Sequence, residues 1–242
     1  MRPRITDVRL LQLRTLQQIG TLEPAWDLGG RMAITTGGGF VTEIHTNEGV
    51  IGIGPGFAPN LLGVVRRVLI GKDPFDVEHY AAALRYYALG LPYNGATGVD
   101  VALWDLIGKF SNQPLYKLWG GGKDRVAAYA STVILGTPEE RAAYATQAAD
   151  EGWQAVKLRL HHPTFAEDIR TMELVRAAVG DRMAIMVDGN QAQSTGRWQP
   201  GVHWDFRRAL ETARALDQLG CYWLEEPLSR FAFADLARLN AA

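Results

Sequence analysis

Apolar and polar side chains alternate one by one near the start of the chain. This pattern predicts strands at residues 5–13 and 40–53, the second of them interrupted by a turn at Asn47-Glu48-Gly49. From about 61 to 119 the apolar positions follow a helical period, with Asp73-Pro74 as a helix start signal. The first part of the chain is therefore expected to be an α+β unit that opens with an antiparallel sheet.

Three glycines, Gly120-Gly121-Gly122, separate this unit from a stretch in which strand and helix patterns alternate. Repeated βα units of this size build both TIM barrels and doubly wound sheets. The fourth expected strand comes late because residues 191–204 form an insertion. The expected strands lie at about 126–134, 154–159, 183–188 and 222–225, and the expected helices at about 138–150, 165–179, 205–219 and 231–240.

Composition narrows the class of partner. The chain has 242 residues, 47% of them hydrophobic, which is enough for one large core or two small ones. The 25 lysines and arginines balance 26 aspartates and glutamates, so there is no basic field for nucleic acid or a membrane surface. The single cysteine, the N-terminus without a signal-peptide pattern and the lack of a long apolar stretch indicate a cytoplasmic protein. A small molecule is the expected ligand.

Charged residues stand at the carboxyl ends of three successive expected strands: Lys157 with Arg159, then Asp188, then Glu225. In a βα barrel these ends meet on the face where catalysis occurs. Each residue alone is most often a solvated side chain, but together they indicate a site. Asp188 and Glu225 offer the oxygen ligands that Mg²⁺ prefers. A cation there would hold a substrate carboxylate and stabilise the enediolate formed when the α-proton leaves.

Four stretches resemble motifs of the mandelate racemase and muconate lactonizing enzyme group of the enolase superfamily. The stretch Val101–Lys109, with Gln113-Pro114 and Leu118–Gly121 after it, resembles the helix that ends this family's capping domain. The family's Lys-x-Lys/Arg, Asp-x-Asn-Gln and Glu-Glu-Pro motifs correspond to Val156-Lys157-Leu158-Arg159, Val187-Asp188-Gly189-Asn190-Gln191 and Trp223-Leu224-Glu225-Glu226-Pro227.

The resemblance implies a fold class: an α+β N-terminal capping domain over residues 1–122, then a truncated (β/α) TIM-type barrel of about four βα units over residues 123–242. Family members place a third carboxylate ligand on the fifth barrel strand and an Asp/His pair on the sixth and seventh, and the sequence has none of these strands. We therefore expect weak Mg²⁺ binding and an incomplete, inactive fragment unless association completes it. A homo-oligomer is expected.

The same resemblance implies roles for individual residues. Asp188 and Glu225 would be the first and second Mg²⁺ ligands, and Lys157 would help to hold the substrate carboxylate. Asn190 would lie near that carboxylate. Glu226 would support the site or be a salt-bridged residue at the barrel mouth.

The capping domain would close over the barrel mouth and select the substrate. This implies a role for the loop at about 17–36, in which Trp26 and Arg31 are the candidate substrate contacts. The insertion, with His203 and Trp204, would lie over the mouth or in an oligomer contact.

One departure from the family pattern bears on the reaction. Arg159 stands where many members place a lysine that moves the proton, and a guanidinium that stays protonated above about pH 12 is a poor general base. Arg159 is therefore interpreted as an electrostatic clamp, which favours a one-base reaction such as dehydration of an acid sugar. His161 is a possible base or an ordinary loop residue. The alternatives are a racemase, epimerase or cycloisomerase of the same superfamily, and a non-catalytic half-barrel module for oligomerisation.

Overall fold

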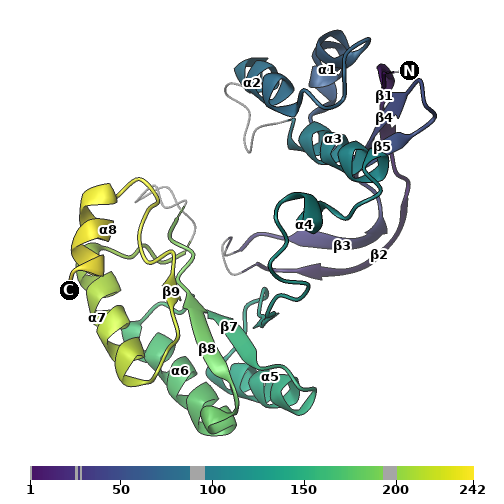
Figure 1. The fold of residues 1–242 in the computed structure, drawn as a ribbon. Helices are drawn as coiled ribbons and strands as arrows, with labels where there is room; N and C mark the ends of the chain where they lie inside the picture. Colours follow the sequence, from purple (N-terminus) through teal and green to yellow (C-terminus); the bar gives the residue numbers. More distant parts are fainter. Residues whose placement is uncertain (1, 25–26, 28, 88–95, 193–200) are drawn as a thin grey trace. The chain divides into compact units, whose positions relative to one another are not determined.

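The chain divides into two compact units, each with its own hydrophobic core, in a computed structural model (Figure 1). The cap unit consists of Met1–Ile19 and Thr35–Val126, and the barrel unit consists of Gly20–Ile34 and Ala127–Ala242. The segment Gly20–Ile34, which we expected in the capping domain, packs with the barrel unit. The structure describes all residues except 1, 25–26, 28, 88–95 and 193–200.

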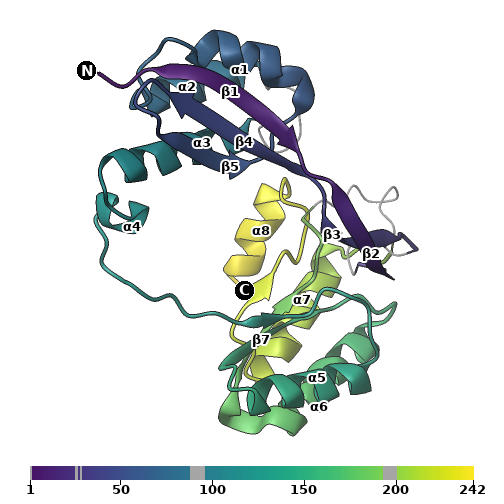
Figure 2. The ribbon, with the colours of Figure 1, turned by 90° about the vertical axis from the view of Figure 1, so that its right-hand side faces the viewer.

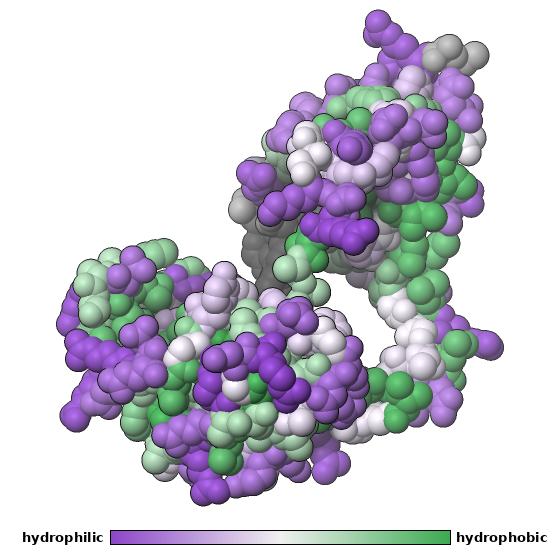
Figure 3. All heavy atoms as spheres, turned by 60° about the horizontal axis from the view of Figure 1, so that its bottom comes forward, coloured by the Kyte–Doolittle hydropathy of each residue, from purple (hydrophilic) through white to green (hydrophobic). Residues whose placement is uncertain are grey.

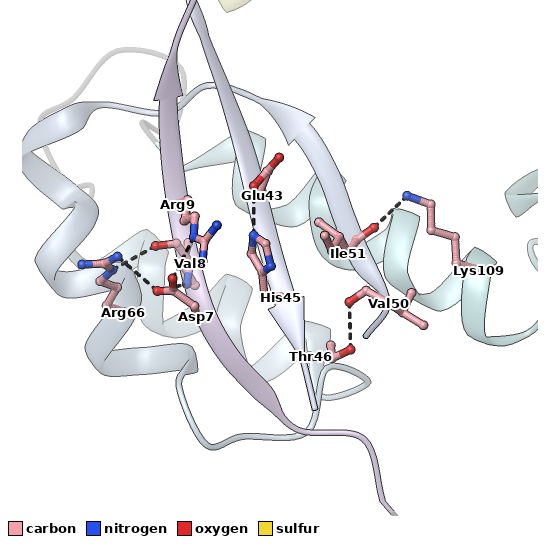
Figure 4. Close-up of polar contacts among 10 residues, drawn as sticks. All are labelled: Asp7, Val8, Arg9, Glu43, His45, Thr46, Val50, Ile51, Arg66 and Lys109. Carbon is pink, nitrogen blue, oxygen red and sulfur yellow. Dashed lines mark hydrogen bonds and ion pairs between the residues drawn. The ribbon is translucent and has the colours of Figure 1, made fainter. Parts of the chain in front are cut away.

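The cap unit is an antiparallel sheet covered by helices. Its elements are β1 (Ile5–Gln12), β4 (Phe40–Thr46), β5 (Ile51–Pro55), a 3-10 turn (Pro59–Leu61), α1 (Leu62–Leu69), α2 (Val77–Tyr87), α3 (Thr97–Phe110) and α4 (Leu115–Leu118). The strand order is β1-β4-β5. Gly52 and Gly54 on β5 leave no room for a side chain against the backbone of α3, so this helix lies directly on the sheet. Figure 4 shows how Arg66 of α1 reaches the sheet, where it contacts the Asp7 carboxylate at 3.1 Å.

Strands β2 (Thr15–Leu22) and β3 (Met32–Gly37) form a hairpin where we expected a loop. They extend the pairing of β1 with β4, because the Leu13 N–H donates to the Gly39 carbonyl at 2.9 Å. Every residue of β3 is exposed, so neither strand needs the apolar alternation that reveals a half-buried strand in a sequence. The expectation of a loop at 17–36 is therefore corrected to a hairpin.

The barrel unit is a parallel sheet with the strand order β6-β7-β8-β9. Figure 1 labels β7, β8 and β9 of this sheet, and Figure 2 labels β7 with helices α5 and α6. Its strands are β6 (Ala130–Ser131), β7 (Ala155–Arg159), β8 (Ala184–Asp188) and β9 (Leu224–Glu225), and its helices are α5 (Pro138–Asp150), α6 (Phe165–Val179), a 3-10 turn (Gly180–Arg182), α7 (Phe206–Gln218) and α8 (Phe233–Asn240). The expected fold class is confirmed: an antiparallel cap is followed by four βα units on a parallel sheet. The first and last of these strands are shorter than the sequence pattern predicted.

Residues along β7 and β8 alternate between the helix-facing core and the opposite face of the sheet. Val156 and Leu158 of β7 are completely buried in the core that α5, α6 and α7 share with the sheet, and so are Ile185 and Val187 of β8. Since successive side chains point to opposite faces of a strand, the residues between them project away from these helices. That second face carries the charged residues of the candidate site.

No helix among the described residues is both long and apolar enough to cross a membrane. Figure 3 shows hydrophilic residues over much of the visible surface, with hydrophobic patches interspersed among them.

Candidate active site

The charged strand ends that we expected to converge do so in the structure. Arg159, Asp188 and Glu225 are register partners across β7, β8 and β9, so they occupy the same level of the sheet. The Asp188 side chain is almost fully enclosed, with 2% of its surface exposed, whereas 36% of the Glu225 side chain is exposed. A ligand that approaches the strand ends therefore meets Glu225 more readily than Asp188.

Two positively charged side chains, those of Lys157 and Arg159, contact these carboxylates. The Lys157 ammonium donates to Glu225 Oε2 at 2.8 Å and lies 3.5 Å from Asp188 Oδ2. The Arg159 guanidinium contacts the same Asp188 oxygen, and its Nε donates to the Thr132 carbonyl at 3.1 Å. The four side chains thus form one cluster in which two positive charges face two negative charges.

Burial and pairing act against each other on the pKa values of this cluster. For Asp188, burial raises the pKa, and the nearby Arg159 offsets this only in part. For Lys157, burial alone would lower the pKa, but the hydrogen bond to Glu225 and the charges of the two carboxylates leave it raised above its usual value. Lys157 is therefore an ammonium at neutral pH in this arrangement, which makes it a binder of negative charge rather than a base.

The turns that follow β8 and β9 adopt an uncommon backbone conformation. Asn190 and Glu226 have positive φ angles of 51° and 49°, which cost of order 1 kcal/mol or more for residues other than glycine. The two turns are joined, because the Gly189 N–H donates to the Glu225 carbonyl at 2.9 Å and the Gln191 N–H to the Glu226 carbonyl at 3.0 Å. The backbone thus locks the ends of β8 and β9 to each other.

The donor atoms present fit a hard divalent cation in kind, but they are few. Asp188 and Glu225 provide carboxylate oxygens on adjacent strands, and the Asn190 Oδ1 atom is buried without a hydrogen-bond partner among the described residues. A buried amide oxygen of this kind, two residues after Asp188, suits Mg²⁺, which prefers oxygen ligands. In the described part of the chain, however, no group of three or more His, Cys, Asp or Glu residues is placed to hold a metal. Asp188, Glu225 and Asn190 are the residues that would hold Mg²⁺ here.

Glu226 lies beside this cluster, whereas His161 contacts other residues. Burial raises the pKa of Glu226, and the neighbouring negative charges of Asp188 and Glu225 raise it further. His161 instead lines a hollow of about 580 Å³ at the start of α5 and α6, where its closest ring neighbour is His162. Burial, followed by the charges of His162 and Arg141, lowers the pKa of His161 to about 4. Its proposed role as a base stays a prediction.

The candidate substrate contacts from the capping loop are only partly described. Trp26 lies outside the described residues, and Arg31 is an exposed residue directly before β3. The segment around them nevertheless touches the barrel unit, because Pro24 forms a β-bridge with Ile134 and the Leu135 N–H donates to Glu23 O at 3.4 Å. These contacts lie just after β6, at the same end of the sheet as the charged cluster.

Two residues that shape the site, Thr132 and Gln191, were given no role from the sequence. Thr132, directly after β6, donates its hydroxyl to the Lys157 carbonyl at 3.0 Å, and its own carbonyl accepts from Arg159 Nε at 3.1 Å, so it holds the Lys157 backbone and the Arg159 side chain. The side chain of Gln191 is buried and bonds to the backbone near Trp204. Thr132 bonds to residues of the next strand, and Gln191 bonds to Trp204 across the insertion, so no helical or strand period in the sequence relates these partners. Gln191 itself belongs to the Asp-x-Asn-Gln motif.

Comparison with known families accounts for this arrangement. Residues 19–120 match the mandelate racemase / muconate lactonizing enzyme N-terminal domain, and residues 140–242 match the enolase C-terminal domain-like family. The chain belongs to the enolase superfamily, in its mandelate racemase / muconate lactonizing enzyme group.

Among its curated relatives are dehydratases, racemases and cycloisomerases. The arabinonate dehydratase of Saccharolobus solfataricus is 30% identical over 203 residues, which is 77% of this chain and 52% of that protein. The L-talarate/galactarate dehydratase of Salmonella typhimurium is 30% identical over 217 residues, 84% of this chain and 52% of that protein. The crystal structure of D-glucarate dehydratase from Agrobacterium tumefaciens complexed with magnesium has a TM-score of 0.79 at 28% identity and covers 98% of this chain and 64% of that one. The chain thus spans about half the length of these curated relatives.

Proposed function

We propose that the natural protein containing this chain removes the proton α to the carboxylate of an acid sugar, with Mg²⁺ bound, and eliminates water. One observation carries the proposal: Lys157 and Arg159 meet Asp188 and Glu225 at the carboxyl ends of consecutive parallel strands. Dehydration is favoured over other reactions of the group because Arg159 is a poor general base. The relatives named arabinonate and L-talarate/galactarate dehydratase support the substrate class.

In this proposal Asp188, Glu225 and the Asn190 amide oxygen hold the cation. When bound, Mg²⁺ would supply positive charge for the substrate carboxylate and for the negative charge that develops on it. Lys157 and Arg159 would exchange their present carboxylate partners for the carboxylate of the substrate. The planar guanidinium of Arg159 is suited to that contact because it donates two parallel hydrogen bonds.

The reaction needs one group that accepts the α-proton. The α C–H bond breaks, the β C–O bond breaks, the β-hydroxyl leaves with a proton as water, and the resulting enol becomes a 2-keto-3-deoxy acid. Lys157 is protonated in the present cluster, so neither it nor Arg159 would take the proton. Within the described chain His161 is the possible base, because its lowered pKa keeps the ring neutral at pH 7. It lines the hollow at the start of α5 and α6, and its pKa of about 4 makes it a weak base.

The proposal is tested with the natural protein at its natural length and with this 242-residue chain alone. Each is incubated with Mg²⁺ and a panel of aldonic and aldaric acids, and α-keto acid is detected as the semicarbazone. Parallel incubations in D₂O, followed by NMR, detect exchange at the α-carbon. Keto acid formation is expected. Deuterium exchange or inverted configuration without keto acid would instead identify a racemase or epimerase.

Variants connect the activity to the cluster. Asp188→Asn and Glu225→Gln remove one charge each from the proposed cation site and should lower kcat/KM by at least about a hundredfold. Asp150→Asn removes a carboxylate from the exposed end of α5 and serves as the control. If both cluster variants retain full activity, the strand-end carboxylates are not the cation site.

A further inference from the structure

The Gln191 side chain lies directly behind the candidate cation site. It is buried, with 5% of its surface exposed, and its carboxamide makes three hydrogen bonds to backbone atoms. The Nε2 group donates to the Gly189 carbonyl at 3.0 Å and to the Val202 carbonyl at 3.1 Å. The Oε1 atom accepts the Trp204 N–H at 2.9 Å. One side chain thus ties the turn after β8 to the chain that enters α7.

The partner segment packs against that turn as well as bonding to it. The Trp204 side chain is almost fully buried, and its ring would lie only 3.2 Å from a Cβ atom at Gly189. A Cβ atom there would also meet the Glu226 carbonyl at 3.2 Å. Gly189 is therefore held between Trp204 on one side and the turn after β9 on the other.

This packing borders the residues that are proposed to hold the cation. Gly189 lies between Asp188 and Asn190, and the Asn190 N–H donates to Asp188 Oδ1 at 2.8 Å. The backbone N–H of Gln191 donates to the carbonyl of Glu226, whose φ angle is positive like that of Asn190. Positive φ angles at residues other than glycine persist only where surrounding contacts enforce them. The Gln191 carboxamide supplies such contacts.

We propose that Gln191 is a positioning residue for the candidate cation site. Its carboxamide holds the end of the inserted β8–α7 connection on the Gly189–Asn190 turn, and thereby sets the direction of the Asp188 and Asn190 oxygens. The inference rests on the proposed function for the identity of the ligand. The hydrogen bonds of the Gln191 carboxamide, which we call the clamp, do not depend on that function. The inference also assigns Trp204 to the core of the barrel unit, not to the barrel mouth or an oligomer contact as we expected for the insertion.

The test compares a substitution in the clamp with a substitution that removes a different buried hydrogen bond. Gln191→Met keeps the volume of the side chain and removes all three bonds. Thr171→Val removes the hydroxyl of a fully buried residue in α6, and this hydroxyl donates to the Glu167 carbonyl at 2.9 Å. Gln191→Asn, which retains the carboxamide on a shorter side chain, tests for partial rescue. Thermal midpoints identify any general loss of stability.

Two properties are measured for each variant. The first is hydrogen exchange of the Gly189 and Gln191 amides by NMR, because these N–H groups join the two strand-end turns. The second is the affinity for Mn²⁺, a paramagnetic probe for an oxygen-ligand site, by EPR. Gln191→Met should raise exchange at both amides at least about tenfold and weaken Mn²⁺ binding about tenfold, as loss of a residue that orients metal ligands does. Thr171→Val should change neither property, and Gln191→Asn should fall between.

Each result decides the proposal. Unchanged amide exchange in Gln191→Met overturns the clamp, and changed exchange with unchanged Mn²⁺ affinity overturns its role in directing the oxygens. An equal loss of Mn²⁺ affinity in Thr171→Val also overturns it, because the effect would then follow general stability. If neither the natural protein at its natural length nor this chain binds Mn²⁺, the cation site of the proposed function fails. The amide exchange alone then supports the clamp or overturns it.

Discussion

Lys157 illustrates how a charged side chain is accommodated inside a packed sheet. Only 6% of it is exposed, and an isolated ammonium there would carry a large desolvation penalty. Glu225 and Asp188 offset that penalty from the two following strands, and Thr132 accepts and donates hydrogen bonds around the same strand end. The charge of Lys157 is thus compatible with burial because the cluster is nearly neutral.

The contact between Lys157 and Glu225 can be measured by a double-mutant cycle. We expect Lys157→Met and Glu225→Gln to show a coupling free energy of about 1 kcal/mol in urea unfolding, a modest value because Glu225 is partly exposed. The exposed pair Arg238 and Asp235 on α8 is the control and should show no measurable coupling. Additive effects of the two cluster substitutions would mean that the 2.8 Å contact does not stabilise the fold.

His161 should make the stability of the chain depend on pH. Burial, together with His162 and Arg141, lowers the pKa of His161 to about 4, whereas the unfolded chain should titrate near the ordinary value of about 6.5. Between these values the unfolded state binds more protons. The stability is therefore fully present above about pH 6.5 and is lost as the pH falls toward 4, by up to about 3 kcal/mol.

The check is the free energy of unfolding in urea at several pH values. In His161→Gln the slope between pH 4 and 6.5 should become smaller, while replacement of the exposed His79 by glutamine should leave it unchanged. A slope that persists in His161→Gln would show that other groups cause the acid sensitivity.

The sequence was sufficient to predict which charged residues meet, but not what holds them in place. Lys157, Arg159, Asp188 and Glu225 could be chosen because the carboxyl ends of parallel strands always meet on one face. Gln191 could be recognised only as part of the Asp-x-Asn-Gln motif, and its role could not be predicted, because its partners near Trp204 are set by how the inserted connection folds back. Such a contact joins residues that no helical or strand period relates.

At the scale of elements, local signals decided which boundaries were predictable. Helix α5 begins and ends where the sequence predicts, because Thr137 and Glu140 form a capping box at its start. Helix α6 ends at Val179, before Gly180 with a φ angle of 55°. Strands β6 and β9 are shorter than predicted because their ladders extend only as far as their neighbours pair with them. The hairpin of β2 and β3 was not predicted, because backbone pairing holds it and its exposed residues show no apolar alternation.

Helices α6 and α7 are joined by a buried ion pair. Asp168 of α6 has no exposed surface, and its carboxylate contacts the Arg208 guanidinium at 2.5 Å and accepts the His162 N–H at 3.1 Å. The guanidinium also lies 5.2 Å from the centre of the Trp204 ring. Burial raises the pKa of Asp168 to about 7 despite the opposing effect of Arg208. The pair therefore supports both the loop after β7 and the segment that Gln191 anchors.

Removal of one member of this pair should destabilise the barrel unit. We expect Arg208→Met to lower the free energy of unfolding by about 3 kcal/mol, since it leaves a buried carboxyl group without its charged partner. The double variant Asp168→Leu with Arg208→Met should lose less than the sum of the single variants. Arg207→Met, next along α7 and paired with the exposed Glu211, should change little. Equal losses for the Arg207 and Arg208 variants would contradict a specific role for the buried pair.

At the scale of the whole molecule, the two hydrophobic cores share no residue among those that the structure describes. The cap core is built from β1, β4 and the helices up to α3, and the barrel core from the parallel strands and α5 to α7. The chain nevertheless passes between the units at both ends of the segment Gly20–Ile34 and again after Val126. Covalent connection of this kind does not require the two cores to unfold together, because cooperativity depends on shared packing.

The separate cores predict two unfolding transitions in calorimetry. Leu103→Ala in the cap and Ile185→Ala in the barrel unit each remove a side chain that is at most 1% exposed, so each should cost about 2–5 kcal/mol in its own unit. Leu103→Ala should lower the midpoint of one transition and leave the other in place, and Ile185→Ala should do the reverse. A single transition that both substitutions shift equally would mean that the units share an interface strong enough to unfold as one. In that case substitutions in the cap would also be expected to weaken Mn²⁺ binding at Asp188 and Glu225, whereas independent units predict that Leu103→Ala leaves this affinity unchanged.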